Sequence, residues 1–321
     1  AGGIVKLKTT HKGNYKIKLA IVQEPQVFLD REKTIERAVQ LVQDGANQGA
    51  RLIVFSEAFI PGYPAWIWRL KPGGDWGLSE KLHGRLLDNA VQLGTDQLRP
   101  LLEVARERQV TIVCGIDERD EDTSRATLYN SVLTISPQGT VQNCHRKLMP
   151  TNPERMVWGF GDAAGMRVID TPVGRVGSLV CWENYMPLAR YALFAQGIDI
   201  YIAPTYDSGD RWIRTLQHIA REGGCWVLGA GNVLRASDLP DDFPEVDRLY
   251  PDREEWIVIS PAGEIVAGPL RQETGLLFAD IEVSEVNAAR RSLDIVGHYA
   301  RPDIFSLQVN TRQQRPVSFN E

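Results

Sequence analysis

The feature that most constrains this chain is an alternation of short apolar stretches with longer amphipathic ones. Residues 17–23 and 52–55 are mainly apolar, as expected of strands buried in a sheet. Between them, Asp30 can cap a helix in which apolar side chains recur at helical spacing, at Ile35, Ala38, Val39, Val42 and Ala46. Strands that alternate with helices indicate an α/β fold.

The same pattern continues along the chain. It predicts further strands at residues 111–117, 128–136, 140–147, 166–170, 176–181, 198–203, 225–229, 256–260, 264–267 and 276–283. It predicts further helices at residues 79–93, 96–108, 185–196 and 211–222. The sequence contains no linker composition and no fixed-period repeat. We therefore expect a single domain over residues 1–321, with mixed sheets covered by helices and a less regular C-terminal tail over residues 292–321.

Composition narrows the function classes. Apolar residues make up 43% of the chain and charged residues 24%, which excludes disordered and fibrous classes. The 36 basic and 41 acidic residues form no long blocks, so we expect neither a nucleic-acid partner nor a membrane partner. The four cysteines form no CxxC pair, and the polar, basic residues 1–15 lack the apolar run of a signal peptide. A cytoplasmic protein is the expectation.

Cys181 is the best candidate for a nucleophile. It follows the apolar stretch 176–180 and precedes a helix predicted to begin near Met186. A thiol at such a strand-to-helix turn is held rigidly and faces the positive end of a helix dipole, which favours the thiolate. The other cysteines, at Cys114, Cys144 and Cys225, lie inside apolar or strand-like runs, where cysteine is normally inert.

Other polar residues follow predicted strands. Glu57 comes directly after the stretch 52–56, at the kind of strand end where α/β sheets place ligands, and a buried carboxylate with a raised pKa can act as a base. On position alone, a capping or salt-bridged glutamate is an equally good interpretation. Lys147 follows another strand, and Glu154 lies in the loop beyond it. By themselves they are typical of solvated surface residues.

The chain lacks the sequence motifs of several other enzyme classes. A serine hydrolase needs GxSxG, and a zinc protease needs HExxH; the chain contains neither. Gly159 and Gly161 form only a fragment of a dinucleotide fingerprint, without the third glycine in place. We therefore expect no cofactor and no metal.

Taken together, three motifs resemble the signature regions of the nitrilases in the carbon–nitrogen hydrolase superfamily. They are FSEAFIPGYP at residues 55–64, HRKLMPTNPERMVWG at residues 145–159 and CWENYMP at residues 181–187. The likeness continues through HIAREGGC at residues 218–225 and covers residues 18 to about 283. The order of the motifs is the order of the family's Glu, Lys and Cys.

The resemblance implies a four-layer αββα sandwich of two mixed sheets. By the motif match, Cys181 is the nucleophile, Glu57 the general base, Lys147 the cationic stabiliser and Glu154 the second glutamate beside the lysine. It also implies homo-oligomers, as dimers or larger spiral assemblies, for which the tail is a plausible contact arm. Two departures are local. Alanines at 163–164 replace a usual glycine, and Trp256 runs straight into residues 257–260, where relatives usually carry a short polar, glycine-containing loop.

The resemblance also narrows the substrate to a small-molecule nitrile. Trp182 and Glu183 directly after the cysteine resemble the nitrilase branch more than the amidase branches. An amidase, a carbamoylase or a cyanide-converting relative remains the alternative, because the same triad serves amides. Tyr63 and Trp182 are the candidate substrate-binding residues, and an aromatic or arylaliphatic nitrile is expected. Trp66 and Trp68 are interpreted as residues of the core or of a subunit contact.

Overall fold

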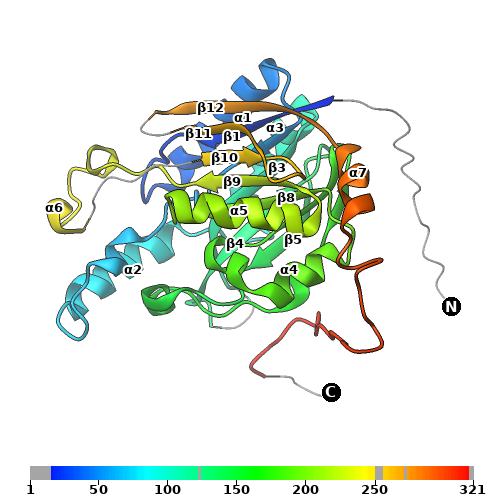
Figure 1. Cartoon of the computed structure of the whole chain (residues 1–321). Coiled ribbons are helices and arrows are strands. Elements are labelled where there is room, and N and C mark those ends of the chain that lie inside the picture. The colour runs from blue at the N-terminus through cyan, green and yellow to red at the C-terminus, as the bar shows by residue number, and fades with distance from the viewer. Residues whose placement is uncertain (1–15, 122–123, 250–255, 271–272, 318–321) are drawn as a thin grey trace, which may run out of the picture.

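Two mixed β-sheets lie at the centre of the molecule (Figure 1). The computed structural model describes residues 16–121, 124–249, 256–270 and 273–317. The first sheet has the order β12-β1-β2-β3-β4-β5, with bounds Gly275–Glu282, Lys16–Gln23, Leu52–Val54, Thr111–Arg119, Leu128–Ile135 and Val141–Arg146. The second has the order β11-β10-β9-β8-β7-β6, with bounds Ile265–Leu270, Trp256–Ile259, Trp226–Gly231, Ile200–Thr205, Gly174–Ser178 and Ile169–Thr171.

Each sheet has a parallel centre and antiparallel edges. In the first sheet β1, β2 and β3 run parallel, while β12, β4 and β5 join by antiparallel pairing. In the second sheet β7, β8 and β9 run parallel, while β6, β10 and β11 are added antiparallel. The hairpins predicted at residues 137–139 and 261–263 are the β4–β5 and β10–β11 connections, so both are confirmed.

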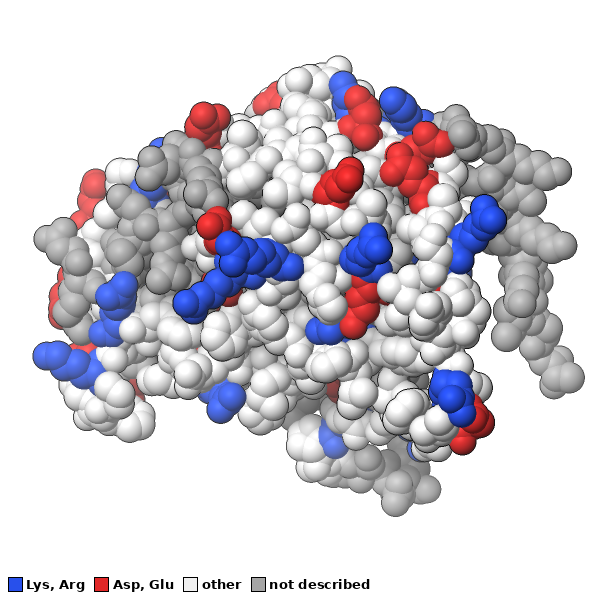
Figure 2. Space-filling model, in the orientation of Figure 1, with Lys and Arg blue, Asp and Glu red and all other residues white. Residues whose placement is uncertain are grey.

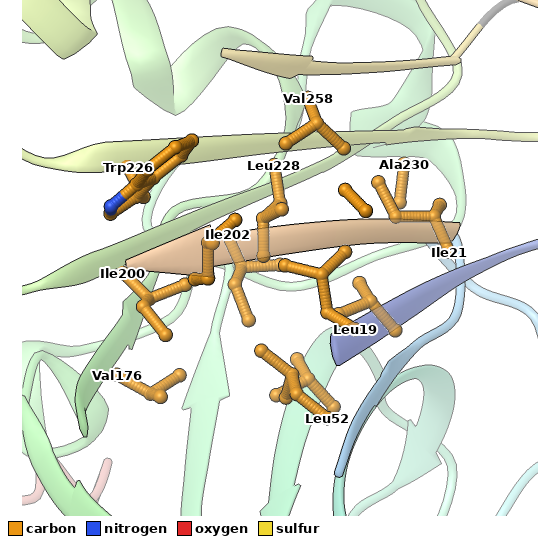
Figure 3. Packing of buried hydrophobic residues seen from close by; sticks show 14 of the residues in the cluster. Leu19, Ile21, Leu52, Val176, Ile200, Ile202, Trp226, Leu228, Ala230 and Val258 are labelled. Carbon is orange, nitrogen blue, oxygen red and sulfur yellow. The ribbon is translucent and has the colours of Figure 1, made fainter. Parts of the chain in front are cut away.

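The main core lies between the two sheets (Figure 3). Side chains of the first sheet, such as Leu19 and Leu52, pack against side chains of the second, such as Val176, Ile202 and Leu228. All five are buried. Because these strands are covered on both faces, their sequences are continuously apolar rather than alternating.

Helices cover the two outer faces. Helices α1 (Arg31–Asn47) and α3 (Arg99–Arg108) share a cluster of buried residues with the first sheet. Helices α4 (Pro187–Phe194) and α5 (Asp210–Gly223) share another with the second sheet (Figure 1). The order of the layers is therefore helix, sheet, sheet, helix, which confirms the predicted αββα sandwich. Asp30 caps α1 as expected, since its side chain accepts a hydrogen bond from the backbone N–H of Lys33.

Further helices and short 3₁₀ turns complete the described part of the chain. They are η1 (Ala65–Trp68), α2 (Trp76–Asn89), η2 (Asp96–Leu98), η3 (Asn152–Met156), η4 (Ala163–Gly165), η5 (Cys181–Tyr185), η6 (Ala236–Asp238), α6 (Val246–Leu249) and α7 (Glu285–Ser292). Beyond α7, the described residues 293–317 contain no helix or strand. Residues 301–317 of this tail are exposed, although the backbone N–H of Gln314 reaches Oδ2 of Asp162 at 2.7 Å.

Figure 2 shows that charges of both signs are interspersed with uncharged surface on the face drawn. None of the described helices combines the length and the apolarity needed to cross a membrane. At the expected site of the shortened loop, Trp256 is the first residue of β10 (Trp256–Ile259) and continues directly into that strand.

Candidate active site

The predicted functional residues meet where strands of both sheets end. Glu57 follows β2, Lys147 follows β5, and Cys181 follows β7 of the second sheet. Strands β2 and β5 point the same way, because two antiparallel pairings separate β5 from β3, which is parallel to β2. The carboxyl ends of parallel strands are where α/β sheets bind ligands.

The segment that carries Glu57 is clamped from both sheets. On the side of β3 it passes so close to Gly115 that a Cβ there would lie 2.2 Å from the backbone oxygen of Ser56, so this position requires glycine. From the end of β9, Asn232 donates to the backbone oxygen of Glu57 at 2.7 Å and accepts from the Ser56 hydroxyl at 3.2 Å. The backbone beneath the carboxylate is thus fixed by contacts that are distant in sequence.

Lys147 lies between the two glutamates. Its Nζ is 2.9 Å from Oε1 of Glu57 and 2.7 Å from Oε2 of Glu154, and all three side chains are buried. Glu154 accepts two more hydrogen bonds, from the Tyr63 hydroxyl at 2.6 Å and from the backbone N–H of Thr151 at 2.6 Å. Charge-assisted bonds of this kind hold the ammonium group in one place.

Cys181 stands at a turn, but the turn differs from the predicted one. Strand β7 ends at Ser178 and not at residue 181, because the N–H of Val180 leaves the ladder and bonds Oε2 of Glu183 at 2.6 Å. Cys181 then opens η5 with a φ of 52°, a left-handed conformation that is costly for a residue with a side chain. The Thr205 hydroxyl, at the end of β8, donates to its Sγ at 3.3 Å.

Burial and neighbouring charges set the protonation states. Burial raises the pKa of Glu57 to about 7; Lys147 opposes this rise and Glu154 adds to it. Burial by itself would lower the pKa of Lys147, but Glu57, Cys181 and Glu154 raise it well above its usual value. The lysine is therefore held as an ammonium group. Glu57 is poised to take or give a proton near neutral pH.

The prediction that the strand-to-helix turn favours the thiolate form of Cys181 is wrong. Burial, and then the charge of Glu57, raise the pKa of the Cys181 thiol, while Lys147 lowers it only in part. A buried thiol beside two carboxylates keeps its proton. Nucleophilic attack from Cys181 therefore needs a base, and Glu57 is the neighbour whose pKa suits that task.

A pocket of about 310 Å³ opens onto these groups. Cys181 and Glu154 form part of its lining, together with the predicted Tyr63 and Trp182. The ring of Tyr63 stacks on Tyr206, with centroids 4.0 Å apart, and Nε1 of Trp182 donates to Asp207 at 2.8 Å. Its remaining lining residues are Ala65, Trp68, Arg69 and Thr151. Four of the ten lining residues are aromatic, and aromatic surface combined with polar groups is typical of small-molecule sites.

All six predicted site residues are thus brought together. The interpretation of Trp66 as a core residue is confirmed, since 1% of it is exposed. Trp68 is not a core residue, because 41% of it is exposed and it lines the pocket; the other half of that interpretation, a subunit contact, stays a prediction. Buried Cys114 and Cys225 have raised thiol pKa values, as expected of inert cysteines, with burial as the cause.

Three further residues escaped the sequence analysis. Asn130 donates to Oε1 of Glu57 at 2.7 Å, Thr205 contacts Cys181, and Asn232 holds the Glu57 segment. Thr205 ends β8 and Asn232 follows β9, so the strand-end rule that found Glu57 also applies to them. Asn130 lies inside β4, where no local pattern distinguishes it.

The donor atoms of Glu57, Glu154 and Cys181 lie within 4.8 Å of one another, which raises the question of a metal site. The Nζ of Lys147 already contacts both glutamates. A divalent cation at the same oxygens would be repelled by this buried ammonium group. The residues therefore do not fit a metal site.

Comparisons with known proteins agree with this geometry. A family model described as carbon-nitrogen hydrolase matches residues 18–291. The chain is 39% identical over 312 residues to a bifunctional nitrilase/nitrile hydratase, NIT4B, of Nicotiana tabacum, covering 94% of this chain and 88% of the relative. It is 39% identical over 321 residues to nitrilase 2 of Arabidopsis thaliana, covering 94% and 91%.

Among solved structures, the fold is similar to that of a carbon-nitrogen hydrolase from Helicobacter pylori G27. The TM-score is 0.69 at 19% identity, covering 91% of this chain and 97% of that one. A similar match is Nit3 of Saccharomyces cerevisiae, a member of branch 10 of the nitrilase superfamily, with a TM-score of 0.69 at 18% identity and coverage of 88% and 96%. At such identities the likeness concerns the fold.

Proposed function

The chain belongs to the carbon–nitrogen hydrolase family, and from this premise we propose that it hydrolyses organic nitriles to carboxylic acids and ammonia. The observation that carries the proposal is the buried contact of Lys147 with Glu57 and Glu154, next to Cys181 in the lining of the pocket. The names of the relatives, which include nitrilases, support the choice of substrate class.

The first half of the reaction forms a thioimidate. Glu57 accepts the thiol proton, and Sγ of Cys181 attacks the nitrile carbon. Negative charge develops on the nitrogen, where Lys147 donates a proton, and the proton held by Glu57 then returns to Lys147. One S–C bond has formed and one C–N π bond is lost. The raised pKa of Glu57, about 7, suits a group that takes a proton and gives it back.

The second half uses two water molecules. Glu57 takes a proton from the first water, whose oxygen adds to the thioimidate carbon. Glu57 passes this proton to the nitrogen, which also takes up the hydroxyl proton of the tetrahedral species. Ammonia then leaves, and a thioester remains on Cys181. A second water, activated in the same way, releases the carboxylic acid and restores the thiol. Nitrile plus two waters thus gives acid plus ammonia, with no change in oxidation state and no further reactant.

The pocket favours nitriles that carry a ring. Tyr63, Trp68, Trp182 and Tyr206 supply aromatic surface around the sulfur, on which a flat apolar group can stack. We therefore propose an aromatic or arylaliphatic nitrile as the substrate. The name of the Nicotiana relative also includes nitrile hydratase, which supports a minor amide product here.

Three properties of the protein as a whole remain our proposals. We propose that residues 1–321 act as one catalytic domain. We propose homo-oligomers, supported by the exposed apolar side chains Tyr299, Ile304 and Phe305 along the tail. A monomer in light scattering at micromolar concentration, or an assembly unchanged by removal of residues 292–321, contradicts this. A cytoplasmic location is proposed because none of the four cysteines is in a disulfide.

The decisive experiment measures acid and ammonia release from a panel of nitriles and their matching amides. We expect turnover of at least one aromatic or arylaliphatic nitrile and poor turnover of its amide. Rapid hydrolysis of amides with no turnover of any nitrile assigns the chain to the amidase or carbamoylase alternative. Turnover of cyanide alone assigns it to the cyanide-converting alternative.

A further inference from the structure

Three buried side-chain oxygens, one of them in the active site, lack a hydrogen-bond donor. Among the described residues, Oε2 of Glu57, Oδ1 of Asn130 and Oδ2 of Asp117 have no hydrogen-bond partner, although all three side chains are buried. Buried polar atoms are nearly always satisfied, so each exception needs a physical reason. For Oε2 of Glu57 the reason is chemical, because a general base needs one oxygen free for the proton.

Asp117 and Asn130 face each other across β3 and β4. They are direct partners in the antiparallel register. The backbone N–H of Asp117 bonds Ile60, and its carbonyl accepts from Val91, so both groups point away from β4. The two residues therefore form a non-hydrogen-bonded pair, the closer of the two antiparallel types, with Cα atoms roughly 4.5 Å apart. Side chains of such a pair lie next to each other on one face.

Each residue of this pair has one side-chain oxygen that lacks a hydrogen-bond partner. Oδ1 of Asp117 accepts from Nε1 of Trp158 at 2.7 Å, and the amide of Asn130 donates to Oε1 of Glu57 at 2.7 Å. Oδ2 of Asp117 and Oδ1 of Asn130 are the two side-chain oxygens of the pair that have no hydrogen-bond partner. An ionised carboxylate and an amide oxygen are both acceptors and repel each other, whereas a protonated carboxyl group donates to the amide oxygen.

The surroundings of Asp117 favour its protonated form. Within the part of the chain that the structure describes, no Lys, Arg or His forms an ion pair with Asp117. The nearby ammonium group of Lys147 is bonded to Glu57 and Glu154. Burial and the charge of Glu57 raise the pKa of Asp117 well above its usual value, and the bond from Trp158 opposes them only in part.

We propose that Asp117 is a positioning residue that, as a neutral carboxylic acid, donates to Oδ1 of Asn130 and so keeps the amide group of Asn130 directed at Oε1 of Glu57. The inference rests on the proposed function for its consequence in catalysis. Asn130 then cannot rotate its oxygen toward Glu57. Oε1 of Glu57 is held by Asn130 and Lys147, and Oε2 alone faces the reacting proton. Asp117 acts only through Asn130 and touches no reacting atom.

Paired substitutions at Asp117 test the proposal. Asp117→Asn is neutral, can accept from Trp158 and can donate to Asn130, so it should keep kcat within about threefold and leave the acid limb of the pH–rate profile in place. Asp117→Ala removes the donor and should lower kcat ~10-fold or more, with KM little changed and the acid limb displaced. Trp158→Phe is the matched control, because it removes the other hydrogen bond of Asp117 but keeps the acid.

The outcomes separate clearly. If Asp117 were ionised, Asp117→Asn would remove a negative charge near Glu57, and the acid limb would move to lower pH. That shift, or a loss in Asp117→Asn as large as in Asp117→Ala, overturns the proposal. An unchanged rate and profile in Asp117→Ala overturns it as well.

A measurement without nitrile turnover keeps the inference separate from the proposed function. The infrared carbonyl band of a protonated carboxyl group should be present in the unmodified protein at a pH well above 7, where Glu57 is ionised, and absent in Asp117→Asn at the same pH. The pH dependence of Cys181 alkylation by iodoacetamide should be the same in these two proteins. If the band is absent from the unmodified protein, the inference fails, whichever substrate is hydrolysed. If no nitrile is hydrolysed but the band and the alkylation behave as expected, only the proposed function fails.

Discussion

Nε2 of His145 lies 3.0 Å from Oε2 of Glu183, so a side chain just before Lys147 is bonded to a side chain just after Cys181. Both are buried, and the same carboxylate accepts the backbone N–H groups of Leu148 and Val180, each at 2.6 Å. Burial by itself would raise the pKa of Glu183, but His145 and these N–H groups lower it below its usual value. One carboxylate thereby fixes the spacing between the lysine and the cysteine.

The first prediction concerns this connection. Glu183→Gln places an NH₂ group against one of the backbone N–H donors, leaving a buried donor without an acceptor. We expect a loss of stability of ~1–3 kcal/mol, seen as a lower Tm, and a kcat reduced by about tenfold or more. The exposed Glu264→Gln is the control and should change neither value appreciably. An unchanged Tm and kcat in Glu183→Gln would show that the connection is dispensable.

The second prediction identifies the nucleophile. Cys181→Ala should abolish ammonia release while the melting transition is retained. Cys225→Ala should keep the activity, because Cys225 is buried outside the pocket and burial raises the pKa of its thiol to about 12. Ammonia release at the original rate from Cys181→Ala would refute the assignment.

The third prediction is a dependence on pH. Glu57 must be ionised to accept a proton, and its pKa is raised to about 7, so kcat should rise with pH through this region. Glu57→Gln should lower kcat at least ~10²-fold, and its residual rate should lack this limb.

The contribution of Glu57 to folding stability should fall as pH rises, whereas kcat should increase. The raised pKa means that the folded protein binds the Glu57 proton more tightly than the unfolded chain does. This contribution is fully present below the unfolded pKa, near 4.5, and is lost as pH rises through about 7. Denaturant unfolding of the unmodified protein against Glu57→Gln measures the difference. If the free energy of unfolding of the unmodified protein, relative to that of Glu57→Gln, increases with pH, the raised pKa of Glu57 is contradicted.

The fourth prediction concerns the charge beside the sulfur. Lys147→Ala removes the cation that lowers the pKa of the Cys181 thiol and leaves Glu57 and Glu154 nearby. Alkylation of Cys181 by iodoacetamide should therefore slow more in Lys147→Ala than in Glu57→Gln, measured at several pH values. The hydrolysis rate of Lys147→Ala should also fall at least ~10²-fold. Equal alkylation rates in all three proteins argue against an electrostatic role for the lysine.

These results also show how far the sequence can be used. Periodicity located most strands and helices because a residue in a buried parallel strand is apolar regardless of its partner. The pairing of β1 with β12 and the stacking of the two sheets follow from contacts distant in sequence; the resemblance implied the stacked sheets, but the pairing was not predicted. Glu57 and Lys147 were found at strand ends.

Asn130 and Asp117 were not found, because their roles depend on register between β3 and β4. The pKa of the Cys181 thiol was misjudged for a related reason. A strand-to-helix turn suggests a positive environment, but burial and two carboxylates determine the environment that the sulfur meets. Neither the depth of a residue nor its charged neighbours can be read from local sequence.

The last prediction concerns what leaves the tetrahedral intermediate. Ammonia departs if its nitrogen is protonated, whereas the thiol departs first, and an amide escapes, if positive charge near the nitrogen is weaker or displaced. Glu154 determines where that charge lies, since its Oε2 accepts from both Lys147 and the N–H of Thr151. Glu154→Gln replaces the carboxylate with a neutral group and should raise the amide fraction of the product. Tyr63→Phe removes the hydrogen bond to Oε1 of Glu154, together with the one that the Tyr63 hydroxyl accepts from Trp68, but keeps the carboxylate, and should raise the amide fraction less. Chromatography of the products from one nitrile, with its amide run separately as a substrate, measures both fractions. An amide fraction that is the same in all three proteins would show that Glu154 does not control the partition.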